Sequence, residues 1–133
     1  MNLLEVLVRP VERFEEPRFQ HLMQQHHYLG ALPKISETLW YVATWADQWV
    51  GLLSFSAAAL KCSARDRWIG WDFRHRYDRL KLLTNNSRFL ILPGWHVPNL
   101  GSRLLSVCQR RLAADWQARF GHPLVLLETF VDP

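Results

Sequence analysis

The sequence predicts a single α/β domain with a mixed β-sheet, and three patterns support this prediction. Two β-rich runs, 38–45 and 49–57, flank the short segment 46–48 and are typical of an antiparallel hairpin. An apolar strand at 88–92 leads into a long amphipathic helix, and a second apolar strand follows at 124–130. Strand, helix and strand in this order favour two parallel strands with a right-handed crossover, so the sheet combines both orientations.

The remaining elements follow from local signals. Residues 3–8 predict the first strand, 31–37 and 93–98 predict loops, and 61–83 predicts one or two short helical pieces. Asn85-Asn86-Ser87 predicts a turn. Acids beside a proline at 15–17 start a further helix, which Gly30 ends. Its apolar face is expected to hold Phe19, Leu22, Met23 and His26.

The long helix is predicted over 99–120, with Asn99 as its N-cap and Gly121 as its stop. Every fourth residue of this stretch is apolar, which predicts one buried face. These residues are Leu100, Leu104, Cys108, Leu112 and Trp116.

Composition indicates one globular domain in the cytoplasm. The chain has 133 residues, 49% of them hydrophobic and 13% aromatic, which supports a sizeable core. Seven tryptophans exceed what such a core needs, so we expect some to face a partner or ligand. Cys62 and Cys108 lie far apart, which argues against a disulfide framework and a CxxC zinc site. The first residues lack a basic region, Glu5 interrupts their apolar run, and no stretch is long enough to span a membrane.

The positive charge is concentrated in one quarter of the chain. Residues 61–88 contain eight basic and three acidic residues, whereas the rest has an excess of one acid. This asymmetry indicates a polyanionic partner, either nucleic acid or a phosphate-bearing cofactor. We expect arginine and lysine to neutralise phosphates and tryptophan to stack on bases. The candidate residues are Arg65, Arg67, Trp68, Trp71, Arg74, Arg76, Arg79 and Lys81. The alternative is an internally packed pair of tryptophans beside a solvated arginine face.

The junction between the apolar strand and the long helix is a candidate phosphate site. Free backbone N–H groups and the helix dipole converge there, and Gly101 admits close approach. The stretch resembles the acyl-CoA-binding loop of GNAT acetyltransferases, whose pattern is Arg/Gln-x-x-Gly-x-Gly/Ala. His96 stands at the Arg/Gln position and Asn99 at the first Gly position. The resemblance implies acetyl-CoA or another acyl-CoA at His96, Asn99, Leu100, Gly101, Ser102 and Arg103; the alternative is an ordinary capped helix.

Five phrases, taken together and in order, resemble a narrower family, the Druantia DruA-like family. They are His27-Tyr28-Leu29-Gly30, Arg65-Asp66-Arg67-Trp68-Ile69-Gly70-Trp71, Asn86-Ser87-Arg88-Phe89-Leu90-Ile91-Leu92-Pro93, Asn99-Leu100-Gly101-Ser102 and Leu127-Glu128-Thr129-Phe130-Val131-Asp132. The resemblance implies a GNAT-like domain over 1–133 that lacks the C-terminal part of longer relatives and so has a sheet truncated after its fifth strand. It also implies a setting in phage defence or beside transposase-like regions.

Other residues with chemical potential have two interpretations each. Glu128 lies in an apolar strand, either as a general base whose pKa is raised by desolvation or as a structural partner of Arg88. His26 and His27 lack metal-ligand spacing to another donor, so capping or packing is expected and no metal site is predicted. No serine or cysteine has a visible base partner, so we assign no nucleophile.

Three functions therefore remain open. The first is a nucleic-acid-binding, GNAT-like domain that uses residues 61–88 in a defence or transposition system. The second is an acyl-CoA-dependent N-acyltransferase with Glu128 as its base. The third is an assembly module that contacts other proteins through a sheet edge after Asp132.

Overall fold

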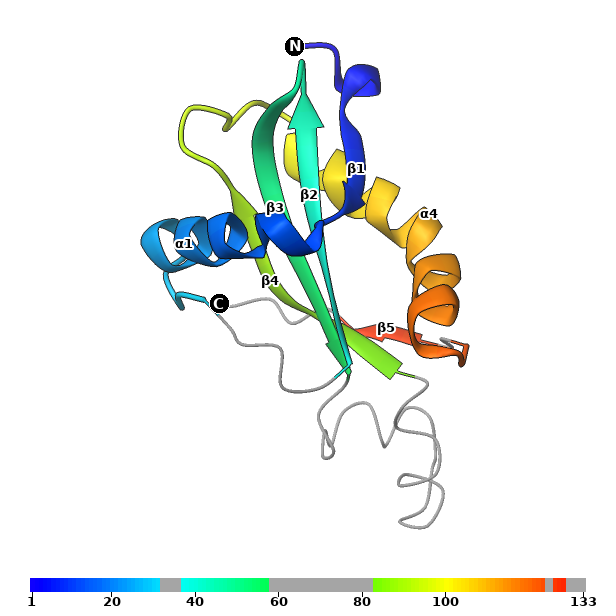
Figure 1. Ribbon diagram of the computed structural model, residues 1–133. Coiled ribbons are helices and arrows are strands. Elements are labelled where there is room, and N and C mark those ends of the chain that lie inside the picture. The colour runs from blue at the N-terminus through cyan, green and yellow to red at the C-terminus, as the bar shows by residue number, and fades with distance from the viewer. Residues whose placement is uncertain (32–36, 58–82, 124–125, 129–133) are drawn as a thin grey trace.

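The computed structural model describes residues 1–31, 37–57, 83–123 and 126–128 (Figure 1). Five strands form one sheet in the order β1-β2-β3-β4-β5. Their bounds are β1 Leu7–Pro10, β2 Thr38–Trp45, β3 Gln48–Ala57, β4 Leu83–Ile91 and β5 Leu126–Glu128. The first four strands are antiparallel and β5 runs parallel to β4, so the predicted mixed sheet is confirmed. The predicted helical pieces at 61–83 lie almost entirely outside the described residues.

Two helices cover opposite faces of the sheet (Figure 1). The helix α1 spans Glu16–His26, and Phe19 stacks on Trp40 with ring centroids 4.6 Å apart. The helix α4 spans Leu100–Phe120, and the five apolar residues predicted for its inner face are all buried. The fourfold spacing therefore identified the buried face correctly. None of the helices in the described ranges has the length and apolar character that a membrane crossing requires.

The β2–β3 hairpin closes through a two-residue turn. Trp45 pairs with Gln48, and the intervening Ala46 and Asp47 have φ angles of 50° and 64°. Two successive left-handed residues are typical of a type I′ turn, whose twist matches that of the flanking strands. The predicted hairpin is confirmed.

The start of the chain differs from the prediction. Residues 3–8 do not form one strand, because Leu3–Glu5 is a single 3-10 turn and β1 begins only at Leu7. The side chain of Asn2 caps this turn by accepting the Leu4 N–H at 3.0 Å. A local side-chain bond thus competes with strand formation.

Two further predictions are corrected. Asn85-Asn86-Ser87 is not a turn but lies inside β4, where Ser87 is the extra residue of a bulge opposite β3. Its hydroxyl lies 2.9 Å from both Ser54 Oγ and Ser56 Oγ, and these cross-strand bonds satisfy a residue type common in turns. The helix α1 ends at His26, which is exposed, and His27 is its C-cap. Gly30 follows as a separate left-handed residue with φ 73°.

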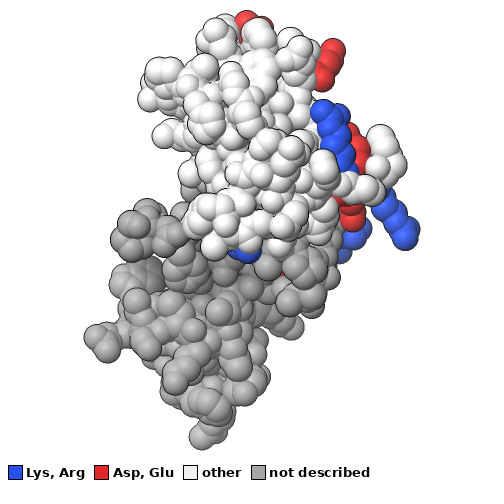
Figure 2. Space-filling model, turned by 90° about the vertical axis from the view of Figure 1, so that its left-hand side faces the viewer, with Lys and Arg blue, Asp and Glu red and all other residues white. Residues whose placement is uncertain are grey.

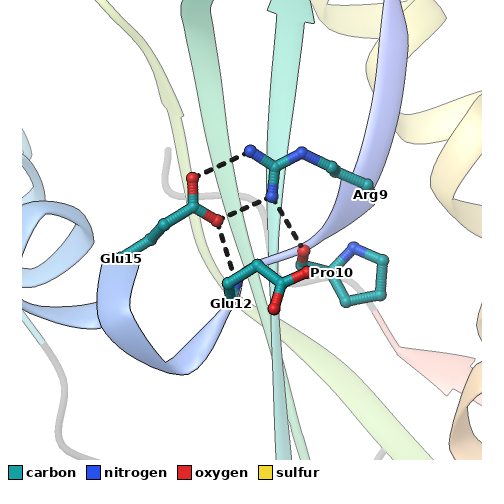
Figure 3. A network of polar contacts seen from close by, with 4 residues as sticks. All are labelled: Arg9, Pro10, Glu12 and Glu15. Atoms are coloured by element: carbon teal, nitrogen blue, oxygen red, sulfur yellow. Dashed lines mark hydrogen bonds and ion pairs between the residues drawn. The ribbon is translucent and has the colours of Figure 1, made fainter.

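An ion pair fixes the connection from β1 to α1 (Figure 3). Arg9 donates to both carboxylate oxygens of Glu15, at 2.7 and 2.8 Å, and the Glu12 N–H donates to the same carboxylate at 3.0 Å. These bonds hold the pKa of Glu15 at about 2, with the Arg9 bond as the largest cause, so the carboxylate is ionised at neutral pH.

Candidate functional site

The segment between β4 and α4 forms a compact loop held by backbone hydrogen bonds. The Leu92 N–H donates to Val50 O at 3.0 Å, which extends the pairing of β4 with β3 by one residue. The Trp95 N–H donates to Leu92 O at 3.1 Å, and the Val97 N–H donates to Trp95 O at 2.8 Å. The predicted loop is confirmed, and its path toward α4 is fixed by its own backbone.

Trp95 anchors this loop to the sheet. Its side chain packs against the buried clusters of both sheet faces and meets Trp45 edge to face, with centroids 5.8 Å apart. A large aromatic ring in this place buries apolar area against both layers. Trp95 therefore holds the loop against the sheet.

Asn99 sets the geometry at the head of α4. It occupies the predicted N-cap, but its side chain makes no capping bond, and its φ of 68° and ψ of 0° place it in the left-handed region. A left-handed residue followed by the right-handed helix turns consecutive N–H groups toward one concavity, an arrangement that binds anions. Asparagine tolerates this conformation better than most side chains, which explains its presence at a glycine position of the acetyltransferase pattern.

Two N–H groups remain open at this turn. The Leu100 N–H donates to Val97 O at 3.3 Å, and the Arg103 N–H donates to Asn99 O at 3.0 Å. Within the described residues, the N–H groups of Gly101 and Ser102 have no hydrogen-bond acceptor. They point from the positive end of a helix of 21 residues. The turn can therefore accept an anionic group from solvent.

The other predicted loop residues contribute unequally. Leu100 is buried and offers only its backbone, whereas the side chains of His96 and Ser102 are exposed. Arg103 is half-buried, and its Nε is buried with no partner among the described residues. A Cβ on Gly101 would lie 3.5 Å from the Phe89 ring, an ordinary contact, so no steric barrier requires glycine here.

Within the described residues, strand β4 has an unpaired stretch of edge beside this turn. Its described pairing with β5 covers Leu83 to Asn85, opposite Leu126 to Glu128 (Figure 1). The bond from Leu92 to Val50 fixes the alternation, so the backbone groups of Phe89 and Ile91 point away from β3. Among the described residues, nothing pairs with them on that side.

The surroundings of the turn carry little charge. Residues 89–102 contain no Asp, Glu, Lys or Arg. Figure 2 shows one face of the molecule, on which the described surface is largely uncharged and charged groups gather along one margin. An anion at the turn would therefore be held by backbone N–H groups, with Arg103 as the nearest basic residue in the sequence.

Glu128 lies at the end of the parallel pairing, where its backbone is in register with Asn85. The structure does not describe the orientation of the Glu128 side chain. A role as general base and a role as structural partner of Arg88 therefore both stay predictions. Arg88 donates from Nε to Gly30 O at 3.0 Å and from NH1 to Ser87 O at 2.8 Å. The first of these bonds ties the segment after α1 to β4.

The predicted nucleic-acid surface falls outside the described residues. These are Arg65, Arg67, Trp68, Trp71, Arg74, Arg76, Arg79 and Lys81, all within 58–82. The described part of the chain contains eight basic and eight acidic residues and so has no net charge. Its five tryptophans are buried or half-buried: Trp40, Trp45, Trp49, Trp95 and Trp116. Trp68 and Trp71 lie outside the described residues and Trp45 and Trp95 are half-buried, so the expectation that some tryptophans face a partner stays a prediction.

The expected absence of a cysteine nucleophile at Cys108 has a physical basis. Burial raises the pKa of this thiol to about 12, so it stays protonated at neutral pH.

His27 accepts the Leu29 N–H at Nδ1, 3.0 Å away, which agrees with a capping role. Burial, and then the charge of Arg88, lowers the pKa of His27. Within the described residues, no group of three or more His, Cys, Asp or Glu side chains is arranged to hold a metal ion.

One polar cluster was not predicted from the sequence. Tyr41 on β2 donates to Asp115 Oδ2 at 2.7 Å, and Arg111 Nε donates to the same oxygen at 2.7 Å. Arg111 and Asp115 are four residues apart, a spacing that is typical of an ion pair on a helix, and this part of the cluster could have been predicted from the sequence. Tyr41 is 74 residues from Asp115 in the chain, so nothing local predicts its participation.

Comparisons with known proteins agree with this architecture. The model of the family described as Druantia protein DruA matches residues 3–133. The solved structure of AAC(6′)-Iy with the bisubstrate analogue CoA-S-monomethyl-acetylneamine is similar, with a TM-score of 0.59 and 12% identity over 96% of this chain and 80% of that chain. The aminoglycoside acetyltransferase meta-AAC0020 from an uncultured soil metagenomic sample, in complex with sisomicin, has a TM-score of 0.57 and 10% identity over 97% and 79%. No curated protein sequence matches significantly. At these identities the likeness establishes a GNAT-like acetyltransferase fold.

Proposed function

Because this chain belongs to the Druantia DruA family, we propose that it is a defence-system domain that binds acyl-CoA at the β4–α4 turn and transfers the acyl group to an amine. One observation carries the proposal: the open N–H groups of Gly101 and Ser102 lie beside the open edge of β4. Of the two solved structures named above, one contains a CoA-based bisubstrate analogue and the other is an aminoglycoside acetyltransferase.

The chemistry of coenzyme A matches the two parts of this site. Its diphosphate is an anion suited to N–H groups at a helix N-terminus. Its pantetheine arm is extended and carries two amides, which can pair with the outward backbone groups of Phe89 and Ile91 as an added strand does. An arm that follows β4 from its end toward Ser87 brings the thioester to the region where β5 meets β4.

We assign the proton transfer to Glu128, the last described residue of β5. In the proposed step the amine nitrogen attacks the thioester carbonyl carbon, the C–N bond forms and the C–S bond breaks. Coenzyme A leaves as a thiolate and takes up a proton from solvent, while the Glu128 carboxylate accepts the proton released by the amine. Burial in the apolar strand would raise the pKa of Glu128 and improve it as a base.

Calorimetry with acetyl-CoA tests the donor site. The unmodified protein should bind at millimolar ligand or below. Asn99→Gly should retain the affinity within about threefold, because glycine adopts a φ of 68° freely. Asn99→Val should lose about tenfold or more, because a β-branched residue resists this conformation and the N–H groups turn away. Absence of binding by the unmodified protein, or equal affinity of the glycine and valine variants, contradicts the proposed site.

A separate observation favours nucleic acid as a partner of the same domain. The described part of the chain is neutral, and residues 58–82 carry seven basic and three acidic residues. We propose that this basic segment binds DNA phosphates, which would place the domain on nucleic acid during defence or transposition. Partners in such a complex would be other proteins of the same system.

The salt dependence of DNA binding measures this second function. Replacing Arg74, Arg76 and Arg79 by alanine should weaken binding and reduce the slope of log K against log salt by about 3, close to one for each lost phosphate contact. A matched control replaces three exposed arginines of the described part, Arg13, Arg110 and Arg119, and should leave the slope unchanged. Equal effects of the two triple variants would show that the segment is not the binding surface.

A further inference from the structure

The strand β1 forms one outer edge of the sheet. Its register with β2 and the bond from Val11 N–H to Trp40 O, 2.9 Å, show that Leu7 and Arg9 direct their backbone groups toward β2. Val6, Val8 and Pro10 therefore direct theirs outward. An outward row of backbone groups is the surface on which another strand adds.

These outward groups are largely occupied from within the molecule. The Val6 N–H donates to Leu3 O at 3.3 Å, and Pro10 has no N–H to offer. Pro10 O accepts from Arg9 at 3.3 Å. The carbonyl of Val8 accepts a hydrogen bond from NH1 of Arg111, which reaches it from α4.

Arg111 is itself fixed by a buried anchor. Its Nε donates to Asp115 Oδ2, and the same oxygen accepts from the hydroxyl of Tyr41, both at 2.7 Å. Tyr41 is fully buried. Burial, and then its bond to Asp115, raises the pKa of Tyr41 far above the physiological range, so its hydroxyl remains a donor. The guanidinium is thus held in one position over the edge of β1.

We propose that Arg111 keeps a strand-pairing surface along β1 closed, and that the partner this edge fits once opened is β1 of a second copy of the chain. Exposed apolar side chains accompany the edge, with Leu4 and Leu7 at 76% and 67% exposure. Antiparallel pairing of two identical edges is symmetric and would bury both sets of leucines. Arg111 blocks it because its guanidinium occupies the carbonyl in the middle of the strand.

Light scattering coupled to size exclusion tests this inference. Arg111→Met keeps the aliphatic stem and removes the donors, and its apparent mass should rise with concentration toward twice that of the unmodified protein. Adding Leu7→Lys places a charge on the opened edge and should restore the original mass. The control Arg110→Met changes the neighbouring exposed arginine and should leave the mass unchanged.

Two results would overturn the inference. One is an Arg111→Met protein that keeps the mass of the unmodified chain at every concentration, and the other is a larger species that Leu7→Lys does not reduce. If circular dichroism shows that Arg111→Met does not fold, Asp115→Asn answers the same question. It retains the guanidinium but weakens its anchor, so an unchanged mass of this variant also counts against the closed edge.

Discussion

Replacing Trp116 by alanine should lower the free energy of unfolding by about 3 to 5 kcal/mol, the usual range for removing a buried aromatic side chain. Trp116 is 0% exposed and meets Phe120 edge to face with centroids 4.7 Å apart. It lies near the end of α4, so its removal leaves a cavity where the helix returns toward β5. Urea denaturation followed by circular dichroism measures the effect.

Phenylalanine at this position separates packing from polarity. The indole Nε1 of Trp116 is buried and has no hydrogen-bond partner among the described residues. Trp116→Phe removes this unsatisfied donor together with part of the ring, so its cost should be only about 1 kcal/mol. The exposed neighbour Gln117 serves as a control, since Gln117→Ala should change stability little. An alanine variant at Trp116 that is as stable as the Gln117 variant would contradict the packing of α4.

The second large effect is expected at Gly51 on β3, which lies under the side chain of Leu104 from α4. A Cβ at this position would lie 2.6 Å from Leu104 Cδ1 and 3.3 Å from Leu90 O. Gly51→Ala must therefore displace α4 or force Leu104 into a poorer rotamer, and it should cost about 1 to 3 kcal/mol. A drop in the midpoint of thermal unfolding reports this change.

Gly101 provides the matched control. A Cβ there meets only the Phe89 ring at 3.5 Å, and the residue lies in the first turn of α4. Gly101→Ala should be neutral or stabilise the protein by up to about 1 kcal/mol, because alanine favours the helix. The two glycine variants should thus shift the midpoint differently. Stabilisation by Gly51→Ala would mean that α4 does not rest on β3 as described.

Much of the fold is local information and was predictable. The hairpin follows from two β-rich runs and a short turn, and α4 follows from five apolar residues at fourfold spacing. Ser87 was mistaken for a turn residue because its bonding partners, Ser54 and Ser56, lie more than 30 residues away in the chain. Asparagine and serine favour turns unless a neighbouring strand supplies hydrogen-bond partners for their side chains.

The candidate site was predictable in part for the same reason. The turn at the head of α4, with its open backbone N–H groups, follows from the position of Asn99 and Gly101 between a strand and a helix. The left-handed conformation of Asn99, in place of a side-chain cap, was not predictable, because asparagine is common both as an N-cap and at positive φ. The hydrogen bond from Arg111 to the outward carbonyl of β1 was not predictable, because the contacts that form it join Tyr41, Arg111 and Val8 across most of the sequence.

The two faces of the sheet hold unequal cores. In the described part, the cluster under α4 contains thirteen buried residues and the cluster under α1 contains seven. Local opening free energies follow the amount of apolar surface that an element buries, so α1 is the side that separates first. Such an opening uncovers the indoles of Trp40 and Trp49 and also releases part of the β4–α4 loop, because Leu92 belongs to the α1 cluster and Trp95 packs against both clusters. Local opening on the α1 face is therefore coupled to the geometry of the turn at the head of α4.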